Sequence, residues 1–265
     1  MTKKHLDKKN NTFPIKFEKP LKSNIALKMF NKSRNYIKVI LDSNHIDINS
    51  YIIVWFGSTS IGGIHGKNII DIMIKTSIKN LMPIVNTFLK KAGKNEFNKV
   101  NNNVSLCYNR YINENAKWPE KLYYFFEIKI NNKDPFYVNL HITANTFEYI
   151  KVKLFKNALI KNKNLIKKYT KIKRTAFKQI IYIETNQINT PKLSNTQKND
   201  IRIAYTNAKK SFITNVLKSI LIKKDKGSLI NLSNKIDKFF SENKYLEKYY
   251  KTDKIYSLFK KFIEK

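Results

Sequence analysis

The residues most able to do chemistry lie in one glycine-rich stretch between positions 57 and 71. The chain of 265 residues has only six glycines, and four of them fall here: Gly57, Gly62, Gly63 and Gly66. Three hydroxyl side chains, Ser58, Thr59 and Ser60, follow the first glycine. Glycine permits positive φ angles and a close approach of the backbone to a ligand, and hydroxyl and free N–H groups can hold phosphate oxygens. The stretch therefore predicts a phosphate-binding loop, the alternative being a tight turn between two buried strands.

Two charged residues complete this stretch. Lys67 would add positive charge beside a bound phosphate, and Asp71 is its only carboxylate, set in the apolar run 69–74. A buried carboxylate is costly unless a cation accompanies it. Asp71 is therefore expected either to hold a metal ion such as Mg²⁺ or to form a plain salt bridge with Lys67.

The loop needs regular elements on both sides to hold it. The apolar, β-branched run 51–56 predicts a buried strand before the loop, and the run 69–74 predicts a second strand after it. Residues 77–93 have apolar positions at helical spacing and end at Gly93, a suitable helix C-cap. The expected order is strand, Gly–Ser turn, acid-bearing strand and helix.

Two more strands are expected at residues 122–130 and 136–143, joined by a turn-like segment. The second of them contains Asn139 and His141, which alternation places on one face of a sheet. A single histidine in a strand is more often structural than catalytic. The residues themselves leave both roles open for His141.

The remaining segments show weaker patterns. Residues 22–50 have helical spacing with an expected break near Ser33, and the polar, Asn-rich segment 94–120 is expected to be irregular. Residues 146–177 are helical in pattern, and residues 180–198 resemble a linker around Pro191. Helices then resume near residue 200, at Gly227 with Ser228 as N-cap, and after Thr252.

The sequence GSTSIGGIHGKNIID at positions 57–71 resembles the signature of the GrpB family, which runs roughly GST-[SA]-VPGL-x-x-KPIID. The matching positions are Gly57, Ser58, Thr59, Ser60, Gly63, Lys67, Ile69, Ile70 and Asp71. Gly62 and Asn68 stand where the family usually has proline, which alters the stiffness of the loop more than its chemistry. A Gly–Ser pair followed a dozen residues later by a strand acid is also the layout of the polymerase-β-like nucleotidyltransferases.

The resemblance implies both a fold and a site. The expected fold is α+β, a small mixed β-sheet of nucleotidyltransferase type flanked by helices, with a helical C-terminal half. The loop residues would bind the phosphates of a nucleoside triphosphate, namely Gly57, Ser58, Thr59, Ser60 and Lys67. Asp71 would hold Mg²⁺ and so act in catalysis.

Weaker motifs extend the resemblance over residues 21–220. Leu140 and His141 resemble the Leu-His strand of the family, which favours a catalytic role for His141 as a base or ligand. Residues 154–159 resemble the family motif FRDYL, and Lys173 fits the following Y-x-x-L-K. Lys156 and Lys173 are therefore expected to contact phosphate or substrate.

One difference from the usual nucleotidyltransferase pattern puts the catalytic activity in question. Metal-dependent nucleotidyl transfer normally uses two or three carboxylates, but the acid strand reads Asp71-Ile72-Met73 and offers no second acid. The GrpB pattern shares this absence. Asp71 could hold one Mg²⁺ together with nucleotide phosphates, and Glu127 on a neighbouring strand is a candidate for the missing carboxylate.

The net charge of +33 invites a nucleic-acid interpretation. However, the basic residues are almost all lysine, and abundant Lys, Asn and Ile are what an AT-rich genome encodes. Specific nucleic-acid surfaces usually favour arginine. The charge therefore keeps RNA as a candidate partner without requiring it.

The sequence also limits the expected cellular location of the protein. No apolar run approaches the roughly 20 residues that a membrane span needs, and the first residues, MTKKHLDKKNN, lack the apolar core of a secretory signal. The single cysteine, Cys107, cannot form an internal disulfide. We expect a cytoplasmic protein with no membrane partner.

The sequence thus predicts three segments: a basic flexible arm at 1–20, a GrpB-like nucleotidyltransferase domain at 21–220 and a helical extension at 221–265. The expected function is transfer of a nucleotidyl group from an NTP–Mg²⁺ complex to an unknown acceptor. The alternative is a non-catalytic nucleotide- or RNA-binding protein of the same fold.

Overall fold

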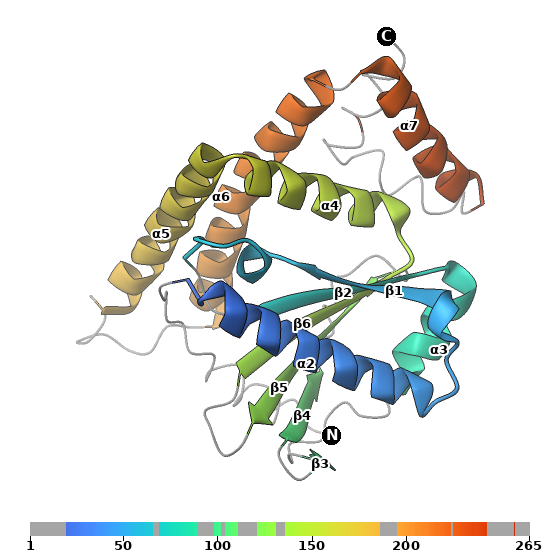
Figure 1. Ribbon diagram of the computed structural model, residues 1–265. Coiled ribbons are helices and arrows are strands. Elements are labelled where there is room, and N and C mark those ends of the chain that lie inside the picture. The colour runs from blue at the N-terminus through green and yellow to red at the C-terminus, as the bar shows by residue number, and fades with distance from the viewer. Residues whose placement is uncertain are drawn as a thin grey trace.

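A computed structural model describes residues 20–65, 69–89, 98–101, 104–110, 121–130, 136–185, 195–223, 225–242 and 257. Its centre is a mixed six-stranded sheet with the strand order β1-β2-β6-β5-β4-β3 (Figure 1). The strands are β1 Tyr51–Phe56, β2 Ile70–Thr76, β3 Asn98–Asn101, β4 Val104–Arg110, β5 Lys121–Ile130 and β6 Phe136–Thr143. Strands β2 and β6 are parallel, and every other described pair is antiparallel.

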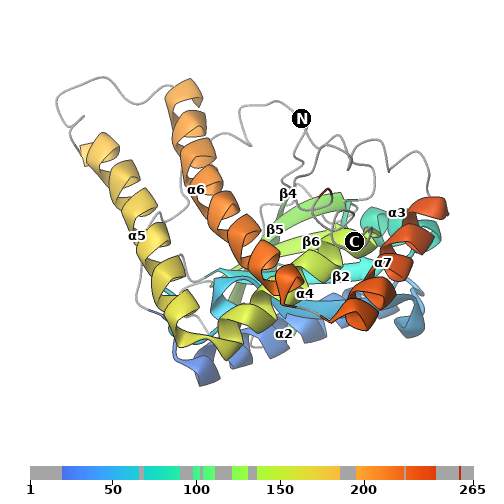
Figure 2. The same ribbon diagram turned by 90° about the horizontal axis from the view of Figure 1, so that it is seen from above.

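The helices occupy both ends of the chain, with most of them in its C-terminal half. They are α2 Ser23–Asp42, α3 Ile78–Leu89, α4 Thr146–Lys161, α5 Lys163–Thr185, α6 Asn195–Ile222 and α7 Lys226–Ser241, with short 3₁₀ helices at Ile48–Ser50 and Ser58–Ser60. Helices α5 and α6 run side by side in both views (Figures 1 and 2). The expected α+β class, with a mixed sheet and a helical C-terminal half, is confirmed.

The two faces of the central strands β2 and β6 differ in chemistry. One face is apolar and packs under α2 and α3, where the buried residues include Ile37, Leu41, Ile70, Ile72, Ile74, Ile84, Phe88, Val138, Leu140 and Ile142. Side chains alternate along a strand, so the other face carries Asp71, Met73 and Lys75 from β2. The same face carries Asn139 and His141 from β6. All the polar residues of interest on these strands therefore lie on the face opposite the main core.

The C-terminal helices form two further apolar clusters. Phe147 and Ile150 of α4 pack with Leu217 of α6 and with Leu229, Ile236, Phe239 and Phe240 of α7. The second cluster joins Ile61 and Ile64, just after the Gly–Ser turn, to Leu159 and Tyr169 of α4 and α5. The apolar stripe of α7 thus packs on the rest of the molecule, and the helical half supports the glycine-rich loop.

The strands expected at 51–56 and 136–143 are confirmed to the residue. The irregular structure expected at 94–120 is wrong for residues 98–101 and 104–110, where β3 and β4 form and β4 pairs with β5 along its whole length. The rest of that range lies outside the described residues. The Asn-rich flanks obscured the apolar alternation of Val104, Leu106 and Tyr108. Pairing with β5 stabilises β4 where the local strand propensity is weak.

Three helix boundaries also differ from expectation. Helix α2 runs unbroken through Ser33, whose hydroxyl donates to the carbonyl of Met29 within the helix. Helices α5 and α6 extend into the expected linker, reaching Thr185 and starting at Asn195, respectively. Helix α7 is capped by the side chain of Asp225, which accepts from the Ser228 N–H at 2.7 Å, and not by Ser228 itself.

Some expectations fall outside the described residues, among them the arm at 1–19, Lys67, the cap at Gly93 and the start of a helix after Thr252. The three-segment division of the chain therefore stays a prediction. Among the helices that the structure describes, none combines the length and the apolar character needed to cross a membrane.

Candidate functional site

The Gly–Ser turn lies directly against the acid of strand β2. Phe56, the last residue of β1, pairs with Asp71 in the antiparallel register, so Gly57 follows immediately beside the carboxylate. Gly57 has φ 72° and ψ −173°, a conformation open essentially to glycine alone. A Cβ at this position would stand 2.0 Å from Oδ2 of Asp71. Only glycine can therefore bring the main chain of the loop so close to this carboxylate.

Side-chain hydrogen bonds hold the shape of the turn. The Thr59 hydroxyl donates to the carbonyl of Ile69 at 2.9 Å and so joins the loop to the start of β2. The Ser60 hydroxyl donates to the carbonyl of Gly57 at 2.9 Å. Among the described residues, no hydrogen bond engages the Ser58 hydroxyl. Thr59 and Ser60 thus stabilise the turn, while the Ser58 side chain is available to a ligand.

Asp71, Asn139 and His141 form a polar cluster across the parallel strands. The Asn139 amide donates to Oδ1 of Asp71 at 3.1 Å and lies 3.0 Å from Nε2 of His141. The edge-to-face contact of Phe56 with His141, at 4.8 Å between ring centroids, packs the imidazole against β1. The structure therefore brings the two sequence-predicted catalytic residues together through Asn139.

Asn139 is the residue that sequence reasoning left out of the site. Its signal was present, since strand alternation placed it on the face of His141. What was missing was the neighbouring strand: only the register Asp71↔Asn139 shows that the amide meets the carboxylate.

Met73 occupies the place where a second acid would stand. It shares the face of Asp71, pairs with His141 in the register, and is only 1% exposed. Within the described residues, no group of three His, Cys, Asp or Glu side chains lies close enough to hold a metal ion. Glu127 lies on the same face of the sheet, on β5 opposite Tyr137, but its side chain is outside the description. One carboxylate suits a single Mg²⁺ that shares its coordination with substrate phosphates, whereas this donor set does not suit two metal ions.

Lys156 reaches the loop from helix α4. Its ammonium donates to the carbonyl of Trp55 at 2.8 Å and lies 5.7 Å from the centroid of that indole ring. Trp55 in turn stacks on Phe30 and directs its indole N–H toward Thr59 at 3.5 Å. Burial lowers the pKa of Lys156 from its ordinary value. Lys156 therefore contacts Trp55, two residues before Gly57, at the entrance to the turn.

Lys173 lies deeper in the helical half. It is 4% exposed and its ammonium is 5.6 Å from the ring centroid of Tyr169. Tyr169 packs with Phe155 and Phe212 in an aromatic cluster beneath the loop residues Ile61 and Ile64. The structure thus gathers Gly57, Ser58, Asp71 and His141 at one place and puts Lys156 beside them, while Lys173 sits within the supporting helices.

Comparison with known proteins gives one family and one solved structure. No curated protein sequence matches this chain at a significant level. The crystal structure of the conserved protein GrpB from Enterococcus faecalis is similar, with 15% sequence identity, a TM-score of 0.41, and coverage of 74% of this chain and 99% of that one. The family model described as GrpB protein matches residues 27–219, which is most of the chain. The chain therefore belongs to the GrpB family.

Proposed function

We propose that this GrpB-family protein binds a nucleoside triphosphate with Mg²⁺ at the Gly57–Asp71 contact and transfers a nucleotidyl group to an acceptor. The observation that carries the proposal is the 2.0 Å separation that a Cβ at position 57 would have from the Asp71 carboxylate. A loop whose backbone lies directly against a carboxylate can bind phosphate oxygens through its N–H groups, next to a residue that can hold the metal ion.

Each loop residue has a distinct part in the proposal. The Ser58 hydroxyl and the N–H groups at the start of the 3₁₀ helix Ser58–Ser60 donate to phosphate oxygens. Thr59 and Ser60 keep the turn in shape through their bonds to main-chain carbonyls. Lys156 holds the end of β1, and Lys67 is proposed to add charge to the bound phosphates.

Asp71 is the proposed metal ligand. Mg²⁺, when bound, would neutralise and orient the phosphate oxygens. Asn139 holds the Asp71 carboxylate through its amide, which leaves Oδ2 directed at Gly57. This arrangement prevents the carboxylate from turning away from the loop.

His141 is proposed to receive the proton of the acceptor hydroxyl as that oxygen bonds to the α-phosphorus and pyrophosphate leaves. The Asn139 amide nitrogen lies 3.0 Å from Nε2 and orients the imidazole. Phe56 packs on the ring edge and limits its rotation.

A thermal-shift titration tests nucleotide binding. ATP, CTP, GTP and UTP are titrated with and without Mg²⁺, because a ligand of the native state raises its melting temperature. We expect a saturable, Mg²⁺-dependent rise with at least one nucleotide, and its loss in Lys67→Ala. If none of the four nucleotides changes the melting temperature, the loop is a structural turn.

The buried Met73 favours a second candidate, a nucleotide- or RNA-binding protein without catalysis, since a second metal ligand is absent there. Gel-shift assays with RNA at rising salt separate the two functions. Tight binding with a steep salt dependence, together with no transfer of label from any α-³²P nucleotide, would support this candidate. Binding that disappears at physiological salt would leave the net charge without a specific partner.

A further inference from the structure

A second polar site lies at the other end of the same two strands. A cavity of about 390 Å³ opens there between the end of β2, the start of α3, the start of α4 and helix α7. Figure 2 shows α3 and α7 at the same end of the molecule. Four of its lining residues are lysines: Lys75, Lys79, Lys235 and Lys238. Glu242 is the one acidic residue that lines it.

The charges in this cavity are unbalanced. Lys75 is partly buried, and its ammonium donates to the carbonyl of Thr76 at 2.6 Å. Burial lowers the pKa of Lys75 from 10.5 to about 8. Lys79, Lys235 and Lys238 face the same space from α3 and α7, with only Glu242 to offset them. An anion in the cavity would relieve both the mutual repulsion and the desolvation of Lys75.

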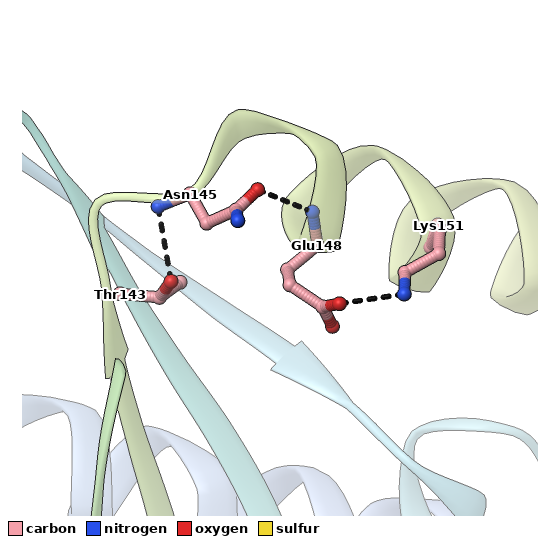
Figure 3. Close-up of polar contacts among 4 residues, drawn as sticks. All are labelled: Thr143, Asn145, Glu148 and Lys151. Carbon is pink, nitrogen blue, oxygen red and sulfur yellow. Dashed lines mark hydrogen bonds and ion pairs between the residues drawn. The ribbon is translucent and has the colours of Figure 1, made fainter. Parts of the chain in front are cut away.

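Two helices begin at the cavity. Ser77 and Ile78 line it at the start of α3, and Thr146 lines it at the start of α4. The free N–H groups and dipoles at helix N-termini favour negative charge. The turn into α4 is drawn in Figure 3, where the main-chain N–H of Asn145 donates to the Thr143 hydroxyl and the side-chain Oδ1 of Asn145 accepts from the Glu148 N–H.

The side chain of Asn145 is incompletely satisfied. Asn145 lies between two lining residues, Ala144 and Thr146, and is fully buried. Its Nδ2 atom has no hydrogen-bond partner among the described residues. A buried amide donor without a partner is unfavourable, but Asn145 does not itself line the cavity, so this amide is not assigned to a bound anion.

The cavity is separate from the Gly57–Asp71 site. Lys75 lies four residues beyond Asp71 on β2, which is about 13 Å along the strand. Helix α7 supplies Lys235, Lys238 and Phe239, and its C-cap residue supplies Glu242. All four lie beyond the residues 27–219 that match the family. Four of the ten lining residues therefore come from a segment outside the family match.

We propose that this cavity is a binding site for a phosphate group, carried by a small molecule or by a nucleic-acid backbone. Its volume is near the lower end of the roughly 300–1,000 Å³ typical of ligand pockets, which suits one or two phosphates with a small attached group. Lys75 and the two helix N-termini bind the oxygens from the sheet side, and Lys235 and Lys238 close over them from α7.

Calorimetry with inorganic pyrophosphate tests the site. The full chain is titrated in EDTA, so that metal-dependent binding at the Gly57 loop is suppressed. We expect saturable binding of one pyrophosphate, weakened at least tenfold in the double variant Lys75→Gln/Lys235→Gln. The matched double variant Lys28→Gln/Lys218→Gln removes the same charge from exposed positions on α2 and α6 and should bind as wild type does.

Further arms exclude a folding artefact and distinguish the two phosphate sources. Lys238→Gln alone changes an exposed residue, so its melting temperature should be unchanged while its pyrophosphate affinity falls. A short single-stranded RNA that competes with pyrophosphate would assign the site to nucleic acid, and an RNA that does not compete would assign it to a small molecule. Undetectable binding at millimolar pyrophosphate, or equal losses in both double variants, would overturn the proposal.

Discussion

Strands β2 and β6 carry opposite chemistry at their two ends. At one end Asp71 is closed in by the backbone of Gly57 and the amide of Asn139. At the other end Lys75 faces an open cavity lined by long, flexible lysine side chains. The first site depends on contacts that leave no room for an extra atom, whereas the second depends on summed charge. Single substitutions should therefore act sharply at the acidic end and gradually at the basic end.

Removal of the charge of Asp71 should have the largest effect. Asp71→Asn is expected to reduce nucleotidyl transfer by at least about 10³-fold, equivalent to about 4 kcal/mol of barrier, because the proposed metal ligand is lost. Transfer of label from an α-³²P nucleotide and urea unfolding are measured on the same variant. Asp42→Asn, an exposed acid on α2, is the matched control.

The stability measurement distinguishes the two roles of Asp71. As a metal ligand, its replacement should leave the free energy of unfolding nearly unchanged. As the buried partner of a lysine, it should cost about 3–5 kcal/mol. Full transfer activity in Asp71→Asn would end the catalytic proposal whatever the stability change.

The glycines of the loop should differ sharply from one another. Gly57→Ala is expected to lower the free energy of unfolding by about 2–4 kcal/mol, because it combines a strained φ with a clash against Asp71. Gly63→Ala, at φ 83° and with only an ordinary 3.9 Å contact from its Cβ to Ile166, should cost about 1–2 kcal/mol from strain alone.

Gly62→Ala is the matched control for this pair. Its Cβ would meet only the Ser23 hydroxyl at an ordinary 3.5 Å. We expect a change within about 0.5 kcal/mol or a slight stabilisation. Equal losses in all three variants, measured by urea denaturation, would show that the contact between Gly57 and Asp71 has no special role.

At the basic end, Lys75→Met should stabilise the protein in a pH-dependent way. Between about pH 8 and 10.5 the unfolded chain holds more proton at this residue than the folded chain does, so the stability of the wild type rises with pH. Below pH 8 both states are protonated and the burial penalty is complete. The variant should therefore be more stable by about 1–2 kcal/mol at neutral pH, after allowance for partial exposure.

This advantage should disappear as the pH approaches 10.5. Denaturation of both proteins from neutral pH to pH 10.5, in a buffer free of phosphate, measures it. A difference that stays constant with pH would show that burial does not disfavour the charge of Lys75.

The smallest expected effects concern the adjacent hydroxyl groups of Ser58 and Thr59. Ser58→Ala should weaken NTP binding about tenfold, with no loss of stability. This change corresponds to the loss of about 1.5 kcal/mol, typical of a hydrogen bond to a charged group. Thr59→Val should instead lose about 1 kcal/mol of stability, because its bond to Ile69 is broken. The reverse assignment, found by titration and denaturation of both variants, would exchange the roles given to these residues.

Local pattern was sufficient for the elements that carry their own signal. The strands Tyr51–Phe56 and Phe136–Thr143 were predicted because apolar runs and alternation are local properties of a chain. The Gly–Ser loop with Asp71 was also predicted, since few glycines occur elsewhere and the family signature is contiguous. Strands β3 and β4 were missed because their Asn-rich flanks obscured the local pattern, and they form through the pairing of β4 with β5 and of β3 with β4.

Contacts between segments distant in the sequence could not be predicted from local pattern and depend on the tertiary structure. Asn139 meets Asp71 across 68 residues of sequence because β2 and β6 become parallel neighbours, and no local pattern specifies that register. Lys173 matched a family motif and was expected to contact phosphate or substrate, yet its side chain is buried within the helical half. The lysine cavity likewise exists only because α7 returns to the end of β2, bringing Lys235 to Lys75. Residue spacing encodes which face of an element a side chain occupies, whereas only the packed chain determines what lies opposite that face.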